Sequence, residues 1–301
     1  MKKALLTSDV RPCVIAVGEV LWDVFAEGAR LGGAPANFAV HAASLGADAC
    51  LVSRVGRDRE GETALRMLAE RGLNVDFVQV DEVRPTGTVP VTVVDGEPSY
   101  EIVEDAAWDA IAWETRLEGL AQRAQAVCFG SLAQREATSR RTLQRFVEAV
   151  PEGCLRVVDI NFRQHYHSAA VVDWSLRFAD LLKLNDEEVR ILRGYLGGPG
   201  DEGDFLREVC ERFRIGRAVL TLGAEGCRVI GPGEDVKAAV AAQNVVNTVG
   251  AGDAFTAAFV LNLLAGEDVR TCAERANQAG GYVTTQDGAI PEIPEAFRVF
   301  Q

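Results

Sequence analysis

Residues Val14–Gly72 read VIAVGEVLWDVFAEGARLGGAPANFAVHAASLGADACLVSRVGRDREGETALRMLAERG. A short apolar run is followed by a helical pattern with proline in its first turn and glycine past its end. A second apolar run and a second helical pattern closed by glycine then follow. The stretch predicts a strand, a helix, a strand and a helix, in the order Val14–Val17, Pro35–Leu45, Leu51–Val55 and Glu60–Arg71. Gly46 and Gly72 close the two helices.

The same alternation continues along the chain. Apolar runs predict further strands at Ala126–Phe129, Leu155–Ile160, Leu181–Leu184 and Ala218–Leu222. Helical patterns lie between them, as at Ser139–Val150 and Phe205–Phe213, and Leu196–Gly203 is interpreted as a surface loop. Strands that alternate with helices indicate βαβ units and therefore a mainly parallel sheet in an α/β domain.

One segment departs from this rhythm. Thr88–Val94 alternates at period two, Asp95–Gly96 follows, and Ser99–Val103 completes a β-hairpin pattern. A hairpin does not belong inside a parallel sheet. It is either an ordinary edge hairpin or part of a small β lid over a site, joined by Glu19–Ala26.

The bulk composition excludes several classes of protein. The 301 residues carry a formal net charge of -13, which argues against a general nucleic-acid binder because such a protein needs a basic face. No apolar run approaches the roughly 18 residues of a membrane span, and Met1–Arg11 lacks the apolar core of a signal peptide. The seven cysteines contain no CxxC pair and are expected to be small buried side chains in a reducing compartment: Cys13, Cys50, Cys128, Cys154, Cys210, Cys227 and Cys272. We therefore expect a cytoplasmic protein with no membrane partner.

The strongest local motif is Asn247–Phe255, NTVGAGDAF, which leads into an apolar helical run ending near Leu264. Small residues at a helix start leave backbone N–H groups open to an anion, and the helix dipole favours negative charge there. Asp253 would then be placed to accept a proton beside a phosphate. From this segment alone, Asp253 is equally well explained as a first-turn charge that the dipole favours.

Three weaker motifs accompany it. In Gly32–Asn37, GGAPAN, two glycines allow a ligand to approach the main chain, or they form a tight turn with a solvent-facing Asn37. In Leu220–Gly226, LTLGAEG, a strand enters a glycine-bounded turn that could hold a nucleotide or be an ordinary turn. Asn185 and Glu188 have the spacing of a helix capping box. The chain has no Walker A motif, no protein-kinase motifs and no GxSxG.

Taken together and in this order, these motifs resemble the PfkB (ribokinase-like) family of carbohydrate kinases, from Gly18 to about Pro291. Four further segments are similar to its bacterial fructokinase branch: Gly18–Phe25 (GEVLWDVF), Pro85–Thr88 (PTGT), Ala107–Asp109 (AWD) and Asp159–His165 (DINFRQH). The resemblance implies one doubly wound α/β domain spanning residues 1–301, with a β lid formed by segments at about 19–31 and 85–105. It implies an ATP-dependent sugar kinase, with fructose converted to fructose 6-phosphate as the expected reaction.

The resemblance also implies roles for individual residues. Asp253 aligns with the catalytic base, and Gly250, Ala251 and Gly252 align with the anion hole. The positions that match sugar-binding residues are Asp23, Gly32, Gly33, Asn37 and Arg163, of which Arg163 faces the sugar or the transferring phosphate. The positions that match nucleotide-binding residues are Asn185, Thr221, Gly223, Gly226 and Asn277. Asn185 and Glu188 match an NxxE motif that is linked to Mg²⁺ through water.

One position departs from the family pattern. The family motif usually begins with Asp, which helps to hold a monovalent cation, and here it begins with Asn247. A K⁺ site at Asn247, Val249 and Gly288 is therefore expected to be weakened, unless Glu292 restores the charge. Two alternatives stay open at this point: a related kinase acting on ribose, 2-keto-3-deoxygluconate or a nucleoside, and a non-catalytic sugar sensor. A homodimer through the lid is also expected, because free strand edges invite pairing.

Overall fold

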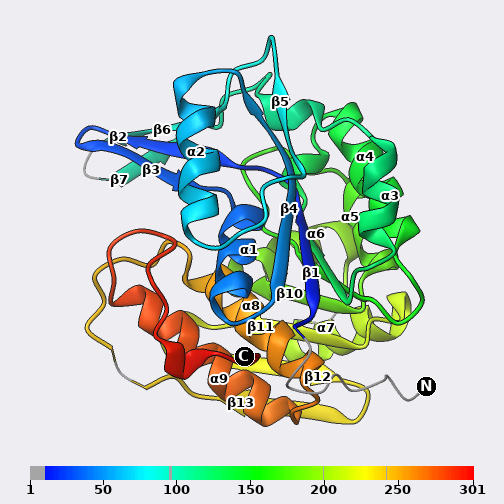
Figure 1. Cartoon of the computed structure of the whole chain (residues 1–301). Coiled ribbons are helices and arrows are strands. Elements are labelled where there is room, and N and C mark those ends of the chain that lie inside the picture. The colour runs from blue at the N-terminus through cyan, green and yellow to red at the C-terminus, as the bar shows by residue number, and fades with distance from the viewer. Residues whose placement is uncertain (1–10, 95–96, 199, 242) are drawn as a thin grey trace.

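A large twisted sheet forms the centre of the molecule (Figure 1). The computed structural model describes residues 11–94, 97–198, 200–241 and 243–301. In this part of the chain the sheet has nine strands in the order β13-β12-β11-β10-β9-β8-β1-β4-β5. The strands are β1 (Cys13–Val17), β4 (Asp48–Gly56), β5 (Val78–Asp81), β8 (Ala126–Phe129), β9 (Leu155–Asp159), β10 (Leu181–Asn185), β11 (Arg217–Thr221), β12 (Cys227–Gly231) and β13 (Glu234–Ala238).

The sheet is parallel from β5 through β11, and β12 and β13 extend it as an antiparallel pair. The strand β1 lies inside the sheet between β4 and β8, so the chain winds outward from it in both directions. In open α/β sheets of this kind, ligands bind beyond the carboxyl ends of the strands, near the point where the winding direction reverses.

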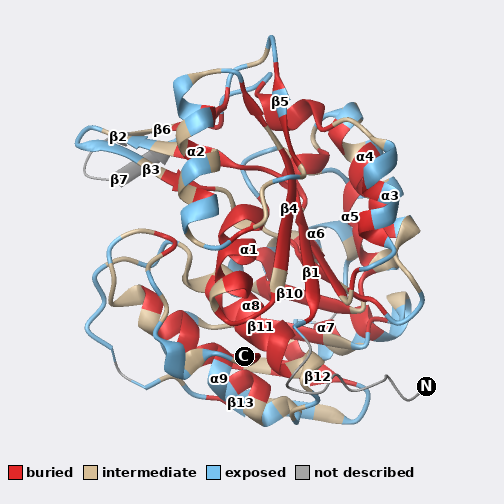
Figure 2. Cartoon of the chain, in the orientation of Figure 1, coloured by how far each residue is buried: buried red, intermediate tan, exposed pale blue. Residues whose placement is uncertain are grey.

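Helices cover both faces of the sheet, which confirms the doubly wound α/β prediction. One face packs on α1 (Ala34–Ser44), α2 (Arg59–Glu70), α8 (Ala251–Leu264) and α9 (Val269–Thr284). The other face packs on α3 (Thr115–Ala121), α4 (Ala137–Ala149), α5 (Ala169–Phe178), α6 (Asp186–Leu196) and α7 (Glu202–Phe213). Alternate residues of a strand enter opposite cores: Val14 and Ala16 join one cluster, and Ile15 and Val17 join the other. Figure 2 shows this burial on the strands and on the inner sides of the helices.

A second, small sheet extends from the same end of the molecule as the carboxyl end of β1 (Figure 1). Its order is β3-β2-β6-β7, built from β2 (Leu21–Phe25), β3 (Gly28–Gly32), β6 (Gly87–Val94) and β7 (Glu97–Tyr100). β2 pairs parallel with β6, while β2–β3 and β6–β7 are antiparallel hairpins. The predicted hairpin is therefore present, and it pairs with the segment near Glu19–Ala26 as expected. Its turn residues, Asp95–Gly96, lie outside the described residues.

The predicted strands and helices are present, most of them with shifted ends, but one loop was predicted too long. Leu196 is the last residue of α6, and Gly203 is buried within α7, so Leu196–Gly203 is not one surface loop. The Asp201 side chain accepts a hydrogen bond from the backbone N–H of Asp204 at 3.0 Å and caps α7. The glycines of this segment favoured the interpretation as a loop, so the cap at Asp201 was not predicted.

Two bulk expectations can be compared with the described residues. No helix among them is long and apolar enough to cross a membrane. Six cysteines, Cys13, Cys50, Cys128, Cys210, Cys227 and Cys272, are buried free thiols. The segment Met1–Arg11 lies outside the described residues apart from Arg11.

Candidate active site

The first turn of α8 lies at the centre of the candidate site. Gly250 caps it with φ 80°, and a Cβ at this position would lie 2.2 Å from the carbonyl oxygen of Ala289, so only glycine fits. Within the described residues, the N–H groups of Gly250, Gly252 and Asp253 have no recorded acceptor, whereas that of Ala251 donates to the Thr248 carbonyl at 3.3 Å. The turn therefore offers an anion the open amides of Gly250, Gly252 and Asp253, whereas the amide of Ala251, also predicted for the anion hole, is bonded within the turn.

Asp253 is joined to the sugar-side motif across 216 residues of sequence. The Asn37 amide nitrogen donates to Asp253 Oδ2 at 2.8 Å. Asn37 is buried on α1, so the reading of a solvent-facing asparagine is wrong. Gly33 is the N-cap of that helix and places Asn37 in its second turn, against α8.

The electrostatic surroundings suit Asp253 to proton transfer near neutral pH. Burial raises the pKa of Asp253 to about 7, and the nearby Asp159 carboxylate adds to the rise. The Asn37 hydrogen bond and the positive charges of Lys183 and Arg163 oppose this shift in pKa. A carboxylate with a pKa near the working pH is an effective general base.

Asp23 lies on β2, one of the two central strands of the small sheet. It is half-buried on β2 opposite Arg30 of β3, and a Cβ on Gly32 would come within 2.7 Å of its Oδ2 atom. The absence of a side chain at Gly32 thus leaves room for this carboxylate. Burial raises the pKa of Asp23 to about 6, and Arg163 partly opposes that shift.

Arg163 acts electrostatically on both Asp23 and Asp253. It follows β9 in an exposed loop, where its guanidinium donates to the Phe162 carbonyl at 3.0 Å. Burial raises the pKa of Asp23 and of Asp253, and the positive charge of Arg163 partly opposes the rise in each. One guanidinium within electrostatic reach of both carboxylates fits a position between a bound sugar and a transferring phosphate.

The predicted nucleotide residues line one cavity of about 750 Å³ beside the first turn of α8. It contains Asn185, Thr221, Gly223, Gly226, Ala251, Gly252 and Asn277. The Asn277 side chain donates to the Ala238 carbonyl at 2.8 Å, so it holds the end of β13 against α9 as well as lining the cavity. Val240, Val245 and Phe255 add apolar walls.

Asn185 and Glu188 form the capping box that their spacing suggests. Asn185 Oδ1 accepts from the Glu188 N–H at 2.8 Å, and Glu188 Oε2 accepts from the Asn185 N–H at 2.8 Å. Burial raises the pKa of Glu188, while Lys183 opposes the rise. The described residues contain no group of three or more acidic, histidine or cysteine side chains that could hold a metal by themselves. Of this pair, Asn185 lines the large cavity, whereas Glu188 is buried behind it. Mg²⁺ usually keeps several waters and needs only one or two carboxylates.

The segment before the anion turn is held by its own side chain. Asn247 Oδ1 accepts from the Val249 N–H at 2.7 Å, and the Asn247 N–H donates to the Thr284 carbonyl at 3.2 Å. Gly288 has φ 83° and precedes Ala289, which packs against Gly250. The three residues predicted for a monovalent cation therefore lie in the two segments that border the anion turn.

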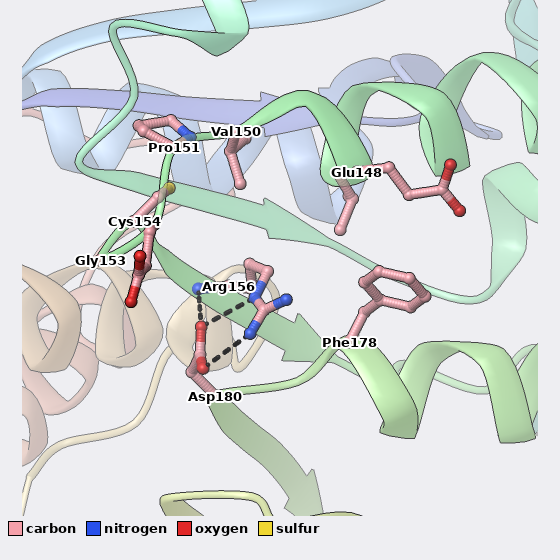
Figure 3. Close-up of a pocket in the computed structure, with 10 residues that line it drawn as sticks. Glu148, Val150, Pro151, Gly153, Cys154, Arg156, Phe178 and Asp180 are labelled. Carbon is pink, nitrogen blue, oxygen red and sulfur yellow. Dashed lines mark hydrogen bonds and ion pairs between the residues drawn. The ribbon is translucent and has the colours of Figure 1, made fainter.

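A second cavity, of about 310 Å³, lies at the opposite, amino-terminal edge of β9 and β10 (Figure 3). Its charged centre is Arg156, whose guanidinium donates to both carboxylate oxygens of Asp180 at 2.9 and 3.0 Å. Because Arg156 is paired with Asp180 and the other charged residues of the lining, Glu148 and Glu152, are acidic, the cavity does not resemble a phosphate site.

Sequence reasoning missed two groups near the site. Glu19 is buried with Oε2 unpartnered in the described residues, and burial raises its pKa to about 7. Lys183 is buried in β10, bonded to Asp159 at 3.1 Å. A lysine inside an otherwise apolar strand was a usable signal, because buried lysines are rare unless paired.

Comparison with known proteins agrees with this geometry. Residues 11–296 match the family described as pfkB family carbohydrate kinase. The chain is 30% identical to a Pyrococcus horikoshii sugar kinase over 92% of this chain and 91% of that one, and 29% identical to an Escherichia coli fructokinase over 87% and 88%. The structure of a double mutant of Vibrio cholerae fructokinase, in a form with fructose, ADP and potassium bound, has TM-score 0.82 and 25% identity over 96% of this chain and 97% of that chain. The chain thus belongs to the PfkB family of carbohydrate kinases and is an ATP-dependent sugar kinase.

Proposed function

We propose that this kinase transfers the γ-phosphoryl group of ATP to fructose and forms fructose 6-phosphate. The observation that carries the proposal is the 2.8 Å bond between Asn37 and Asp253, which joins the sugar-side helix α1 to the anion turn of α8. The choice of fructose is supported by fructokinases among the relatives, such as the Escherichia coli enzyme. The V. cholerae fructokinase form with fructose and ADP bound adds to this support.

In the proposed reaction, Asp23 and Asn37 bind sugar hydroxyl groups, and Gly32 and Gly33 let the sugar approach the main chain. The hydroxyl oxygen attacks the γ-phosphorus, the bond from that phosphorus to the β–γ bridging oxygen breaks, and ADP leaves. Asp253 accepts the hydroxyl proton. The open amides of the Gly250–Asp253 turn stabilise negative charge on the phosphoryl oxygens, and Arg163 adds positive charge.

The nucleotide role falls to the residues of the large cavity: Asn185, Thr221, Gly223, Gly226 and Asn277. Glu188, with Asn185, would hold Mg²⁺ through water, where the ion would offset phosphate charge. The small sheet acts as a lid that excludes water from the site. A homodimer through its edges and a cytoplasmic location complete the proposal, the latter supported by the six buried free thiols.

The substrate is tested by a panel of fructose, ribose, 2-keto-3-deoxygluconate and adenosine with Mg-ATP, in which ADP release is measured. We expect the highest kcat/KM for fructose, and a phosphate on the 6-position in the ³¹P NMR spectrum of the product. A higher kcat/KM for another acceptor would replace fructose, while sugar binding without ADP release would favour the sensor.

K⁺ activation should be modest in the natural chain and stronger in Asn247→Asp. The Asn247 carbonyl oxygen already accepts from Val249, and an amide offers a cation only a dipole. In Asn247→Asp, one carboxylate oxygen could accept the same hydrogen bond from Val249. The other oxygen would then attract the cation with a full negative charge. The measurement is kcat/KM against K⁺ at constant ionic strength, balanced with a bulky organic cation. Strong wild-type activation that Asn247→Asp leaves unchanged would show that Asn247 does not control the ion.

A further inference from the structure

Lys183 lies in the middle of a strand that is otherwise apolar. It is 8% exposed on β10 and is the direct register partner of Asp159 on β9. Its Nζ atom bonds Asp159 Oδ1 at 3.1 Å. A buried ion pair is weak support for stability, because the desolvation of both charges offsets much of their attraction. The pair therefore calls for an explanation beyond packing.

The location of this ion pair supplies such an explanation. A Cβ on Gly252 would lie 3.3 Å from Lys183 Nζ, so the ammonium lies directly against the anion turn. Asp159 reaches the same turn through its other oxygen, since Thr256 Oγ1 lies 3.2 Å from Asp159 Oδ2 and 2.8 Å from the Gly252 carbonyl. The ion pair thus supports the turn whose amides face the phosphate.

The charges around the ammonium come from three neighbouring elements, whereas its register partner on β11 is the apolar Val219. Burial disfavours the charged form of Lys183, but the carboxylates of Asp159 on β9, Glu188 on α6 and Asp253 on α8 raise its pKa. The 3.1 Å bond to Asp159 holds the ammonium in an ion pair. Arg163, in the loop after β9, is the other cation that acts on Asp253. Asp159 is the recorded partner of only one of the three ammonium N–H donors among the described residues.

We propose that Lys183 is a positioning residue for phosphoryl transfer, which holds a permanent positive charge beneath the anion turn and beside Asp253, and that Asp159 orients it. The inference rests on the proposed roles of Asp253 and the anion turn. A preorganised charge next to developing negative charge acts without rearrangement at the moment of reaction. Neither residue was assigned a role from the motifs.

The test compares Lys183→Met with the neutral double variant Lys183→Met/Asp159→Asn. The double variant removes both charges, keeps an oxygen acceptor for Thr256 and should restore the melting temperature that the single variant loses. We expect kcat, measured on the alkaline plateau, to fall about 10- to 100-fold in both, the range for residues that support a site from behind. The KM for the sugar should stay within about twofold, since the charge acts on the transfer step.

Recovery of kcat together with stability in the double variant would overturn the proposal, because a purely structural pair would be rescued. If Lys183→Met does not fold, the kcat of the double variant alone tests the proposal. The acid limb of the pH profile gives a second readout: it should move up in Lys183→Met and down in Asp159→Asn, as the charges acting on Asp253 require. Shifts in the same direction, or none, would contradict the assignment.

The same two strands supply a matched control. Arg156 on β9 pairs with Asp180, just before β10, at the opposite edge of the sheet (Figure 3). Arg156→Met also breaks an ion pair between these segments, yet it should lower the melting temperature while kcat stays unchanged. Asp253→Asn is assayed in parallel to separate the positioning role of Lys183 from the base role of Asp253. If Asp253→Asn is active while Lys183→Met is slow, Asp253 is not the base, but the role of Lys183 remains.

Discussion

Asp253→Asn should lower kcat by about 10²–10⁴, the usual contribution of a general base. The substitution keeps the shape of the side chain and an oxygen that can accept the Asn37 hydrogen bond, but it removes the basicity. The KM for sugar and for ATP should change little, because the lost interaction develops in the transition state. Steady-state kinetics with fructose and Mg-ATP measures the effect. A variant with more than half of the wild-type kcat would exclude Asp253 as the base.

The stability of this variant is a useful control. The raised pKa of Asp253 means that the folded chain binds this proton more tightly than the unfolded chain does. Ionisation of Asp253 therefore destabilises the fold as the pH rises toward and through about 7. Asparagine carries no such cost, so at pH 8 the variant should melt no lower than the wild type. A loss of activity that came with a lower melting temperature would indicate damage to the fold.

The sequence predicts best those elements whose pattern is complete within their own residues. The strand Ala126–Phe129 is a bounded apolar run and was predicted to the residue, and the Asn247–Phe255 motif correctly marked the start of α8. β13 is different, because Glu234–Ala238 (EDVKA) carries no apolar pattern and becomes a strand through its pairing with β12. Such an edge strand depends on tertiary contacts that a local pattern does not contain.

The candidate site shows the same difference between features that a local pattern predicts and features that only the fold determines. Motifs pointed to Asp253 and Asn37 separately, but only the fold brings together residues 216 positions apart. The partnership of Lys183 and Asp159 depends on β9 and β10 being neighbours in register, which spacing alone cannot give. Turn chemistry was visible in the sequence, as in the capping box of Asn185, whereas the buried charges behind the turn were not.

Asp23→Ala should weaken sugar binding about 10- to 150-fold, which corresponds to the roughly 1.5–3 kcal/mol of a hydrogen bond to a charged group. The carboxylate lies against Gly32 and forms no hydrogen bond with the described residues, which leaves it able to accept one from a sugar hydroxyl. Calorimetry with fructose measures the change, and ADP affinity should be nearly unaffected because Asp23 does not line the nucleotide cavity. Unchanged affinity for every active sugar would refute the role.

Val24→Ala is the matched control for this prediction, since Val24 is the next residue of β2, faces the opposite side of the small sheet and is 37% exposed. It should leave sugar affinity unchanged. The pH dependence adds a test that truncation cannot mimic: the pKa of Asp23 is raised to about 6 by burial, so its charge is present above this pH and lost below it. Sugar affinity of the wild type should therefore fall as the pH drops from 7 to 5. In Asp23→Asn, affinity should be weak throughout and should not show this fall, because the amide has no charge to lose. An identical fall in both proteins would assign the pH dependence to another group.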